Sequence, residues 1–398
     1  MMKVYLDNGA TTKTADEVVE AMNPYFNKKY GNSSSMHKWG MKAQKAMRKS
    51  RKNIAEKINA TPDEIIFTSG GTESNNLTLK GLAFKNKGKK NHIIVSKAEH
   101  DCVLNSAKWL DKQGFDITYL NVDKYGIVDP TDLKKAITKD TFLVSIMHAN
   151  NEIGTILPIG KYGKICRENN VLFHTDACQS FTKVPIDVKE MKLDLVTLNA
   201  HKIHGPKGVG ALYKRKGIKI TPLLHGGGHE FNLRSSTSNV SGIVGFAESA
   251  YIHTQEDIQK METLRDYLKE ELLKIPDTHL NGHPEERLCN NVSISFHFIE
   301  GESLLMNLSM RGIAVSTGSA CSSNSLEPSH VLLAIGLAHE IAHGTIRFTL
   351  SRYTTKKEID YTIKNVKEAV IKLREMSPLK KGVKYKTDDY DDEHQPIF

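Results

Sequence analysis

Lys202 is the residue whose surroundings point most directly to chemistry. It follows the apolar run from Leu193 to Leu198 and stands between His201 and a Gly-Pro-Lys-Gly turn. Burial strips the hydration from an ammonium group, so packing alone rarely places a lysine at the end of a buried strand. A desolvated lysine amine forms Schiff bases, as it does with pyridoxal phosphate (PLP). The alternative is a solvent-exposed lysine at the end of a strand.

A glycine-rich turn is suited to hold the phosphate of such a cofactor. The run Thr68-Ser69-Gly70-Gly71-Thr72 follows a β-type segment, and a helical pattern opens at Thr72. Backbone N–H groups of glycines approach a phosphate closely, and a helix N-terminus adds partial positive charge. An ordinary capped helix start would produce the same pattern.

Three further side chains are typical of groups that contact a pyridine ring. Asp176 ends a β-type run, where its carboxylate would pair with a protonated ring nitrogen, and Gln179 would reach the ring hydroxyl. His100 follows a run that ends at Ser96, and its imidazole would stack on the ring and move protons. The alternatives are a helix N-cap for Asp176 and a structural role for His100.

Cys321 is a candidate nucleophile, and Arg347 is a candidate for binding the substrate. Cys321 lies in a stretch of small polar residues, 316–325, where a thiol on a loop can enter a site and leave it again. An unperturbed thiol pKa of about 8.5 leaves a few per cent of nucleophilic thiolate at neutral pH. Arg347 stands in the middle of a β-type run, where its guanidinium would bind a substrate carboxylate through two hydrogen bonds. An internal ion pair is the alternative for Arg347.

Composition excludes several classes of protein. The 398 residues are 39% hydrophobic and 25% charged, with a net charge of +9 that favours anionic ligands. The lysines are scattered and lack interleaved aromatics, so we expect no nucleic-acid partner. Five widely spaced cysteines without a C-x-x-C pair predict a reducing cytoplasm, with no disulfide framework or metal site. We expect no signal peptide and no membrane span.

Alternating patterns predict an α/β fold. Between residues 60 and 225 we expect strands at 65–68, 92–96, 116–120, 142–148, 171–176, 193–198 and 210–214, with helices such as 72–85, 103–113 and 159–168 between them. Such alternation indicates βαβ units and a mostly parallel sheet, whose ligand lies beyond the carboxyl ends of its strands. A long helix over 245–273 would lead to strands at 291–298, 313–316 and 345–350 and helices at 301–310 and 356–376.

Nearly the whole chain resembles the NifS/IscS-like cysteine desulfurases within the class V aminotransferases. The resemblance is carried by Asp7-Asn8-Gly9-Ala10-Thr11-Thr12, Ser69-Gly70-Gly71-Thr72-Glu73-Ser74, Glu99-His100, Asn150-Asn151-Glu152-Ile153-Gly154, Asp176-Ala177-Cys178-Gln179, His201-Lys202, His225-Gly226-Gly227-Gly228-His229-Glu230, Arg234-Ser235-Ser236-Thr237, Ser319-Ala320-Cys321, Leu326-Glu327-Pro328-Ser329-His330 and Arg347.

The resemblance implies PLP fold type I, with a seven-stranded, mostly parallel sheet in the large domain and a smaller α+β domain. The large domain would cover 15–255, and the small domain, carrying the Cys321 loop, would cover 1–14 and 256–377. Residues 378–398 form a charged segment that we expect to be a flexible tail serving partners.

The resemblance also implies a role for each site residue. Lys202 would hold PLP and move the Cα proton, with His100, Asp176 and Gln179 around the ring. Gly71, Thr72, Asn199 and His201 would surround the phosphate, with Thr237 from the other subunit of a homodimer, and Asn151 and Arg347 would bind the substrate carboxylate. Cys321 would take the sulfur of L-cysteine as a persulfide, release L-alanine and supply a sulfur acceptor such as an iron–sulfur scaffold.

Two departures from the family pattern touch the phosphate site, and two alternative functions remain open. Asn199 stands where a small hydroxyl residue is usual, and Ser236 stands where glycine is usual; a third departure, Ser33, replaces a proline elsewhere. A different PLP enzyme, such as an aminotransferase or selenocysteine lyase, has no evident need for the Cys321 loop. A non-catalytic docking scaffold has no reason to retain Lys202 and Asp176.

Overall fold

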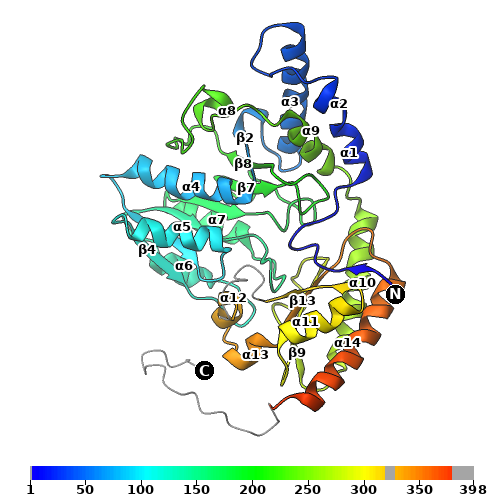
Figure 1. Cartoon of the computed structure of the whole chain (residues 1–398). Helices are drawn as coiled ribbons and strands as arrows, with labels where there is room; N and C mark the ends of the chain where they lie inside the picture. Colours follow the sequence, from blue (N-terminus) through cyan, green and yellow to red (C-terminus); the bar gives the residue numbers. More distant parts are fainter. Residues whose placement is uncertain (1, 319–327, 379–398) are drawn as a thin grey trace.

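The largest sheet carries seven strands, as the sequence predicts. The computed structural model describes residues 2–318 and 328–378 (Figure 1). The strands lie in the order β2-β8-β7-β6-β5-β3-β4, and β8 runs antiparallel to both of its neighbours while the others share one direction. Their bounds are β2 (Ile65–Thr68), β3 (His92–Ser96), β4 (Asp116–Leu120), β5 (Thr141–Ser145), β6 (Leu172–Asp176), β7 (Leu195–Asn199) and β8 (Gly210–Lys214).

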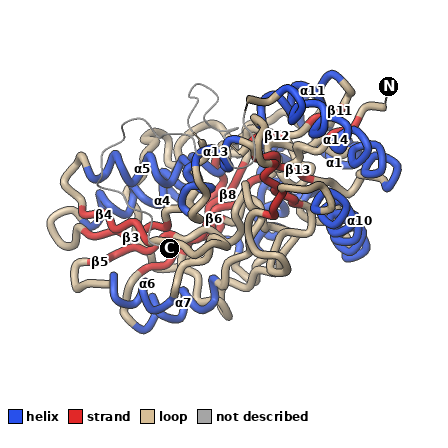
Figure 2. Tube along the Cα trace, turned by 90° about the horizontal axis from the view of Figure 1, so that it is seen from below, coloured by secondary structure: helices blue, strands red, loops and turns tan. Residues whose placement is uncertain are grey.

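Helices cover both faces of this sheet. Figure 2 shows α4 and α5 on one side of the strands and α6 and α7 on the other. The helices that accompany the sheet are α1 (Asp16–Met22), α2 (Pro24–Asn27), α3 (Lys38–Glu56), α4 (Gly71–Asn86), α5 (Asp101–Asp111), α6 (Pro130–Ala136), α7 (Ile159–Glu168), α8 (His229–Asn232) and α9 (Val240–Ser249).

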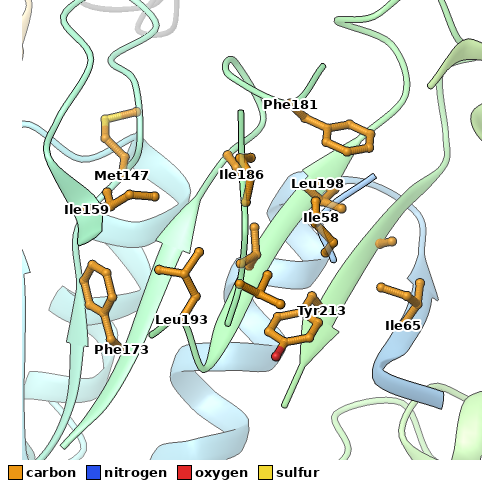
Figure 3. Close-up of a cluster of buried hydrophobic side chains, with 14 of the residues drawn as sticks. Ile58, Ile65, Met147, Ile159, Phe173, Phe181, Ile186, Leu193, Leu198 and Tyr213 are labelled. Atoms are coloured by element: carbon orange, nitrogen blue, oxygen red, sulfur yellow. The ribbon is translucent and has the colours of Figure 1, made fainter. Parts of the chain in front are cut away.

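Alternate residues of the strands pack into two separate cores because successive side chains of a strand point to opposite faces. In β2, Ile65 and Phe67 belong to one buried cluster, while Ile66 belongs to the other. Figure 3 shows part of the first cluster, where Phe173 of β6 and Leu198 of β7 face the same side. Burial on both faces explains why these strands read as continuous apolar runs.

The remaining elements form two smaller sheets with their own hydrophobic core. The four-stranded sheet has the order β12-β13-β10-β9, and β1 pairs with β11. These strands are β1 (Val4–Tyr5), β9 (Thr278–Leu280), β10 (Asn291–Phe296), β11 (Ile313–Ala314), β12 (Ser316–Thr317) and β13 (Thr345–Thr349), and the helices are α10 (Gln255–Leu273), α11 (Gly301–Met310), α12 (His330–Ala334), α13 (His339–His343) and α14 (Lys356–Met376). Among the helices that the structure describes, none combines the length and apolar character needed to cross a membrane.

The two-domain division expected from the sequence stays a prediction, with limits at 15–255 for the large part and at 1–14 with 256–377 for the small part. One observation supports it: a buried cluster joins Leu6 near the N-terminus to Phe348 and to α14, apart from the cores of the large sheet. The charged segment 378–398 lies outside the described residues apart from Pro378.

The predicted helix over 245–273 is wrong in one respect, because two helices occupy that region. The first helix, α9, starts at Val240 and ends at Ser249, and α10 begins at Gln255. Thr254 starts α10 as a capping box: its hydroxyl accepts from the Asp257 N–H at 3.2 Å, and the Asp257 carboxylate accepts from the Thr254 N–H at 3.2 Å. This reciprocal pairing starts the second helix, whereas the first helix ends with Ala250 as its C-cap. Sequence analysis also gave no expectation for α1, α2 and α3.

Replacing Thr254 with alanine should destabilise the protein by about 1 kcal/mol, because the cap satisfies backbone N–H groups that the helix itself leaves unpaired. Thr263→Ala is the matched control, since Thr263 is exposed in the middle of the same helix and bonds only the Gln259 carbonyl. Urea denaturation followed by circular dichroism measures both. Equal losses in the two variants would contradict the capping role.

Candidate active site

A cavity of about 310 Å³ lies where the carboxyl ends of several strands meet. Crevices at these strand ends bind ligands in open α/β sheets. The cavity collects residues from the N-terminal segment, from the loops after β2, β3, β5, β6 and β7, and from β13: Gly9, Ala10, Gly71, Thr72, His100, Cys102, Met147, Asn151, Asp176, Cys178, Gln179, Asn199, His201, Lys202 and Arg347.

The start of α4 forms one wall of the cavity. Gly70 caps the helix with φ 157° and ψ −177°, a backbone conformation that is essentially confined to glycine. Gly71 and Thr72 then line the cavity. A side chain at position 71 would place its Cβ 2.7 Å from the Cys178 sulfur, so the cavity wall leaves no room for one. Exposed N–H groups and the helix dipole make this wall suited to an anion.

Asp176 brings a buried negative charge to the cavity. Burial alone raises the pKa of its carboxyl group, but hydrogen bonds from Asn75 and Cys178 outweigh that effect and hold the pKa below its usual value. The Asn75 amide donates at 2.7 Å, and the Cys178 backbone N–H donates at 2.9 Å. The group is therefore a carboxylate, ready to accept from a cationic nitrogen.

Two neutral imidazoles face the cavity. Burial, followed by the charge of Lys202, lowers the pKa of His100. The Cys102 backbone N–H donates to His100 Nδ1 at 3.1 Å, so Nε2 carries the proton of the neutral ring. Burial, again followed by Lys202, lowers the pKa of His201 to about 4. A neutral ring is free to stack on an aromatic cofactor or to accept a proton.

Lys202 lies in the cavity wall three residues beyond the end of β7, directly after His201. Its backbone carbonyl accepts from the buried ammonium of Lys183 at 3.5 Å. Asn199 ends β7, and its amide nitrogen lies 3.3 Å from His201 Nε2. Its side-chain oxygen is buried and has no hydrogen-bond partner in the part of the chain that the structure describes. A buried, incompletely bonded amide in a cavity wall favours a polar ligand there.

Arg347 brings a buried guanidinium from β13, as predicted. Its Nη1 donates to the Asn151 carbonyl at 3.0 Å, and its Nη2 pairs with Asp7 at 3.1 Å. Within residues 2–318 and 328–378, its buried Nε has no hydrogen-bond partner. Arg347 therefore makes an internal ion pair and also lines the cavity. Gln179 lies beside it, with its amide donating to the Gly9 carbonyl at 3.0 Å.

One predicted residue lies apart from this chain's cavity, and one lies outside the described residues. Thr237 is exposed and does not contribute to the cavity wall, and Cys321 falls in the undescribed segment 319–327. Conversely, Cys102 and Cys178 line the cavity although sequence analysis gave them no role there. Each stands two residues beyond a predicted site residue, His100 or Asp176, and that spacing was the available signal.

Comparison with known proteins agrees with this geometry. The aminotransferase class-V family matches residues 4–362. A relative named cysteine desulfurase IscS, from Methanosarcina thermophila, is 54% identical over 379 residues, which cover 94% of each chain. A solved structure titled NifS-like protein has a TM-score of 0.88 at 42% identity and covers 94% of this chain and 100% of its own. A structure titled SspA in complex with cysteine has a TM-score of 0.81 at 38% identity and covers 89% of this chain and 100% of its own.

The chain belongs to the aminotransferase class-V family and has the PLP fold type I. Within that family it is an enzyme of the cysteine desulfurase class, so the resemblance found in the sequence is confirmed. The residues present fit PLP: a lysine, a buried carboxylate, a neutral imidazole and an anion-binding helix start line one cavity.

Asn199→Ala should weaken PLP binding by about one to two orders of magnitude, because we expect the Asn199 amide to donate one charge-assisted hydrogen bond to the phosphate. The variant should lose PLP on dialysis and regain activity with excess cofactor, whereas Asn199→Ser should bind at least as well as the unchanged chain. Titration of the cofactor-free protein, followed by absorbance, measures both. Equal affinity in Asn199→Ala would show that this side chain does not reach the phosphate.

Proposed function

We propose that the protein uses PLP to convert L-cysteine to L-alanine, captures the sulfur as a persulfide on Cys321 and passes it to acceptor proteins. The observation that carries this proposal is the meeting of Lys202, Asp176, His100 and Arg347 in one cavity from segments far apart in the sequence. Iron–sulfur cluster assembly, or another thiolation, is the use of the sulfur that we propose.

Bound PLP supplies an electron sink that weakens the bonds of a substrate attached to it. Lys202 holds the cofactor and moves the proton at the substrate Cα. Asp176, whose pKa is held low, would keep the ring nitrogen protonated, and His100, whose pKa is also lowered, would lie against the ring in its neutral form. Gln179 bonds the ring hydroxyl.

The anionic ends of cofactor and substrate are held on different walls of the cavity. Gly71, Thr72, Asn199 and His201 surround the phosphate. A homodimer completes this group, with Thr237 supplied by the partner chain, which agrees with the exposure of Thr237 and its distance from the chain's own cavity wall.

Arg347 and Asn151 bind the substrate carboxylate. The buried Nε of Arg347 is without a hydrogen-bond partner among the described residues, and its Nη1 already contacts Asn151. A guanidinium held in this way presents a fixed geometry to a carboxylate.

The four cysteines that the structure describes are poor nucleophiles, which supports Cys321 as the sulfur acceptor. Burial raises the pKa of Cys102 to about 12 and that of Cys289 to about 11, and it also raises the pKa of Cys166 and Cys178. The Cys321 thiolate would bond to the substrate sulfur as the carbon–sulfur bond breaks. The electron pair of that bond stays with the carbon, which takes up a proton and leaves as alanine.

We place the enzyme in the cytoplasm, where reduced thiols persist and sulfur acceptors reside. The acceptor is a protein such as an iron–sulfur scaffold. The charged segment 378–398 serves this transfer and takes no part in the chemistry of the cavity.

Cys321→Ala should abolish release of alanine and sulfide from L-cysteine while retaining the absorbance change that follows substrate addition. The reason is that substrate binding needs Lys202 and Arg347, whereas removal of sulfur needs the thiol. Cys166→Ala, a change within α7, is the matched control and should keep its activity. Near-normal turnover in Cys321→Ala would show that Cys321 is not the nucleophile and would favour Cys102 or Cys178.

Truncation after Ser377 should leave turnover with a small-molecule reductant nearly unchanged and reduce persulfide transfer to a protein acceptor. The removed segment is too polar to bury much apolar surface by itself. Parallel assays with dithiothreitol and with a purified iron–sulfur scaffold protein separate the two steps. Equal loss of both activities would assign the segment to the fold or to catalysis instead.

A further inference from the structure

Residues 225–237, here called the arm, contain a run of unfavourable backbone conformations. Glu230 and Phe231 have φ/ψ of 47°/53° and 58°/35°, and Asn232 has φ 64°. L-residues other than glycine and asparagine rarely adopt this left-handed region, because Cβ crowds the following carbonyl. Strain of this kind persists only where surrounding contacts impose it, and it concentrates near functional sites.

The contacts that impose this conformation centre on Glu230. Both carboxylate oxygens accept from the Arg51 guanidinium at 2.7 Å, and one also accepts from the Phe67 backbone N–H at 2.8 Å. The two side chains are 12% and 6% exposed, so water hardly screens the pair. Arg51 also donates to the Ile65 carbonyl and lies over the Phe67 ring at 4.7 Å. We call the Arg51–Glu230 pair the clamp.

The clamp ties the arm to the sheet through β2 and α3. Figure 1 shows α8 beside β2 near the end of the molecule where α3 lies. Phe231 also packs under the Arg51 guanidinium, with its ring centroid 5.1 Å away. Glu230 and Phe231, two residues of the left-handed turn, therefore both contact the Arg51 guanidinium.

A second ion pair fixes the far end of the arm. Arg234 donates to Glu73 at 2.8 Å and 3.3 Å, and Glu73 accepts from the Ser69 backbone N–H at 2.7 Å. Glu73 belongs to the first turn of α4, the helix whose start lines the cavity. Thr237 follows three residues after Arg234, so an arm that is held at Glu230 and again at Arg234 limits where Thr237 can lie.

We propose that Arg51 and Glu230 are positioning residues, which hold the arm so that Thr237 reaches the phosphate site of the partner subunit. This inference rests on the homodimer and the Thr237 contact of the proposed function. It adds a specific demand: a defect in the clamp of one chain must appear as weak PLP binding in the other chain's cavity.

The first test compares three variants for PLP affinity, folding and dimerisation. Arg51→Met should remain folded and dimeric and bind PLP about tenfold or more weakly, a loss comparable to one charge-assisted hydrogen bond. Arg51→Lys keeps the charge but loses the two-point contact, and it should fall between Arg51→Met and the unchanged chain. Arg48→Met is the matched control, because Arg48 is exposed on the same helix. Unchanged PLP affinity in folded Arg51→Met would overturn the proposal.

Glu230→Gln provides the second route if Arg51→Met does not fold. Glutamine keeps the shape of the Glu230 side chain and removes its negative charge, so the ion pair with Arg51 is lost. The expected loss of PLP affinity is the same in direction, and a folded Glu230→Gln dimer with unchanged affinity would also overturn the proposal.

Mixed dimers show which cavity the clamp serves. In each, one chain carries Lys202→Ala, so only one Lys202 can be trapped with PLP by borohydride. When Arg51→Met is on the chain that keeps Lys202, the PLP concentration needed to trap the cofactor on Lys202 should equal that of mixed dimers without Arg51→Met. With Arg51→Met on the Lys202→Ala chain, trapping should need about tenfold more PLP. The opposite pattern would mean that the clamp acts within its own chain.

The same two mixed dimers, with Thr237→Ala in place of Arg51→Met, distinguish failure of this inference from failure of the proposed function. No effect of Thr237→Ala in either mixed dimer would refute the contact between subunits, and the inference with it. An effect of Thr237→Ala across the dimer, with none from Arg51→Met, would refute only the clamp.

Discussion

A buried negative charge at Asp176 is the constraint on which the site depends. A carboxylate removed from water stays ionised only if hydrogen bonds replace its hydration. Here Asn75 comes from α4 and the Cys178 N–H comes from the turn after β6, so a helix and a strand end must meet at a fixed distance. The same meeting places the start of α4 against the strand ends, which forms the anion-binding wall of the cavity.

The second half of the site requires the smaller sheets to lie against the large one. Arg347 comes from β13, yet its guanidinium contacts the Asn151 carbonyl from the loop region after β5 and the Asp7 carboxylate from the N-terminal segment. A guanidinium so deeply buried needs these acceptors to offset its lost hydration. The part of the cavity that Arg347 lines therefore exists only when three distant parts of the chain are assembled.

Burial also distinguishes the unreactive thiols of the chain from the proposed reactive one. Four cysteines are buried or half-buried, and burial keeps each of them protonated. Cys102 and Cys178 can thus lie beside a bound cofactor without attacking it or the substrate, since the thiolate is the nucleophilic form. Under the proposed function the reactive thiol is that of Cys321, and the small polar residues around it in the sequence predict a loop.

The sequence alone determined the elements and the chemistry at their ends, because both are local. Apolar runs that alternate with helical patterns located all seven strands of the large sheet. Residues at the strand ends marked Lys202, Asp176 and His100 as neighbours at one edge. The break between α9 and α10 was missed, although the Thr254 capping box that starts α10 is a local signal.

Tertiary structure decided what depends on pairs far apart in the chain. Asn75 as the partner of Asp176, Asp7 as the partner of Arg347 and Arg51 as the partner of Glu230 are separated by at least 100 residues. No local pattern encodes such pairs, because the free energy of each depends on burial and on the approach of other elements. The left-handed turn after Gly228 has the same origin: its residues disfavour that conformation by themselves, and distant partners impose it.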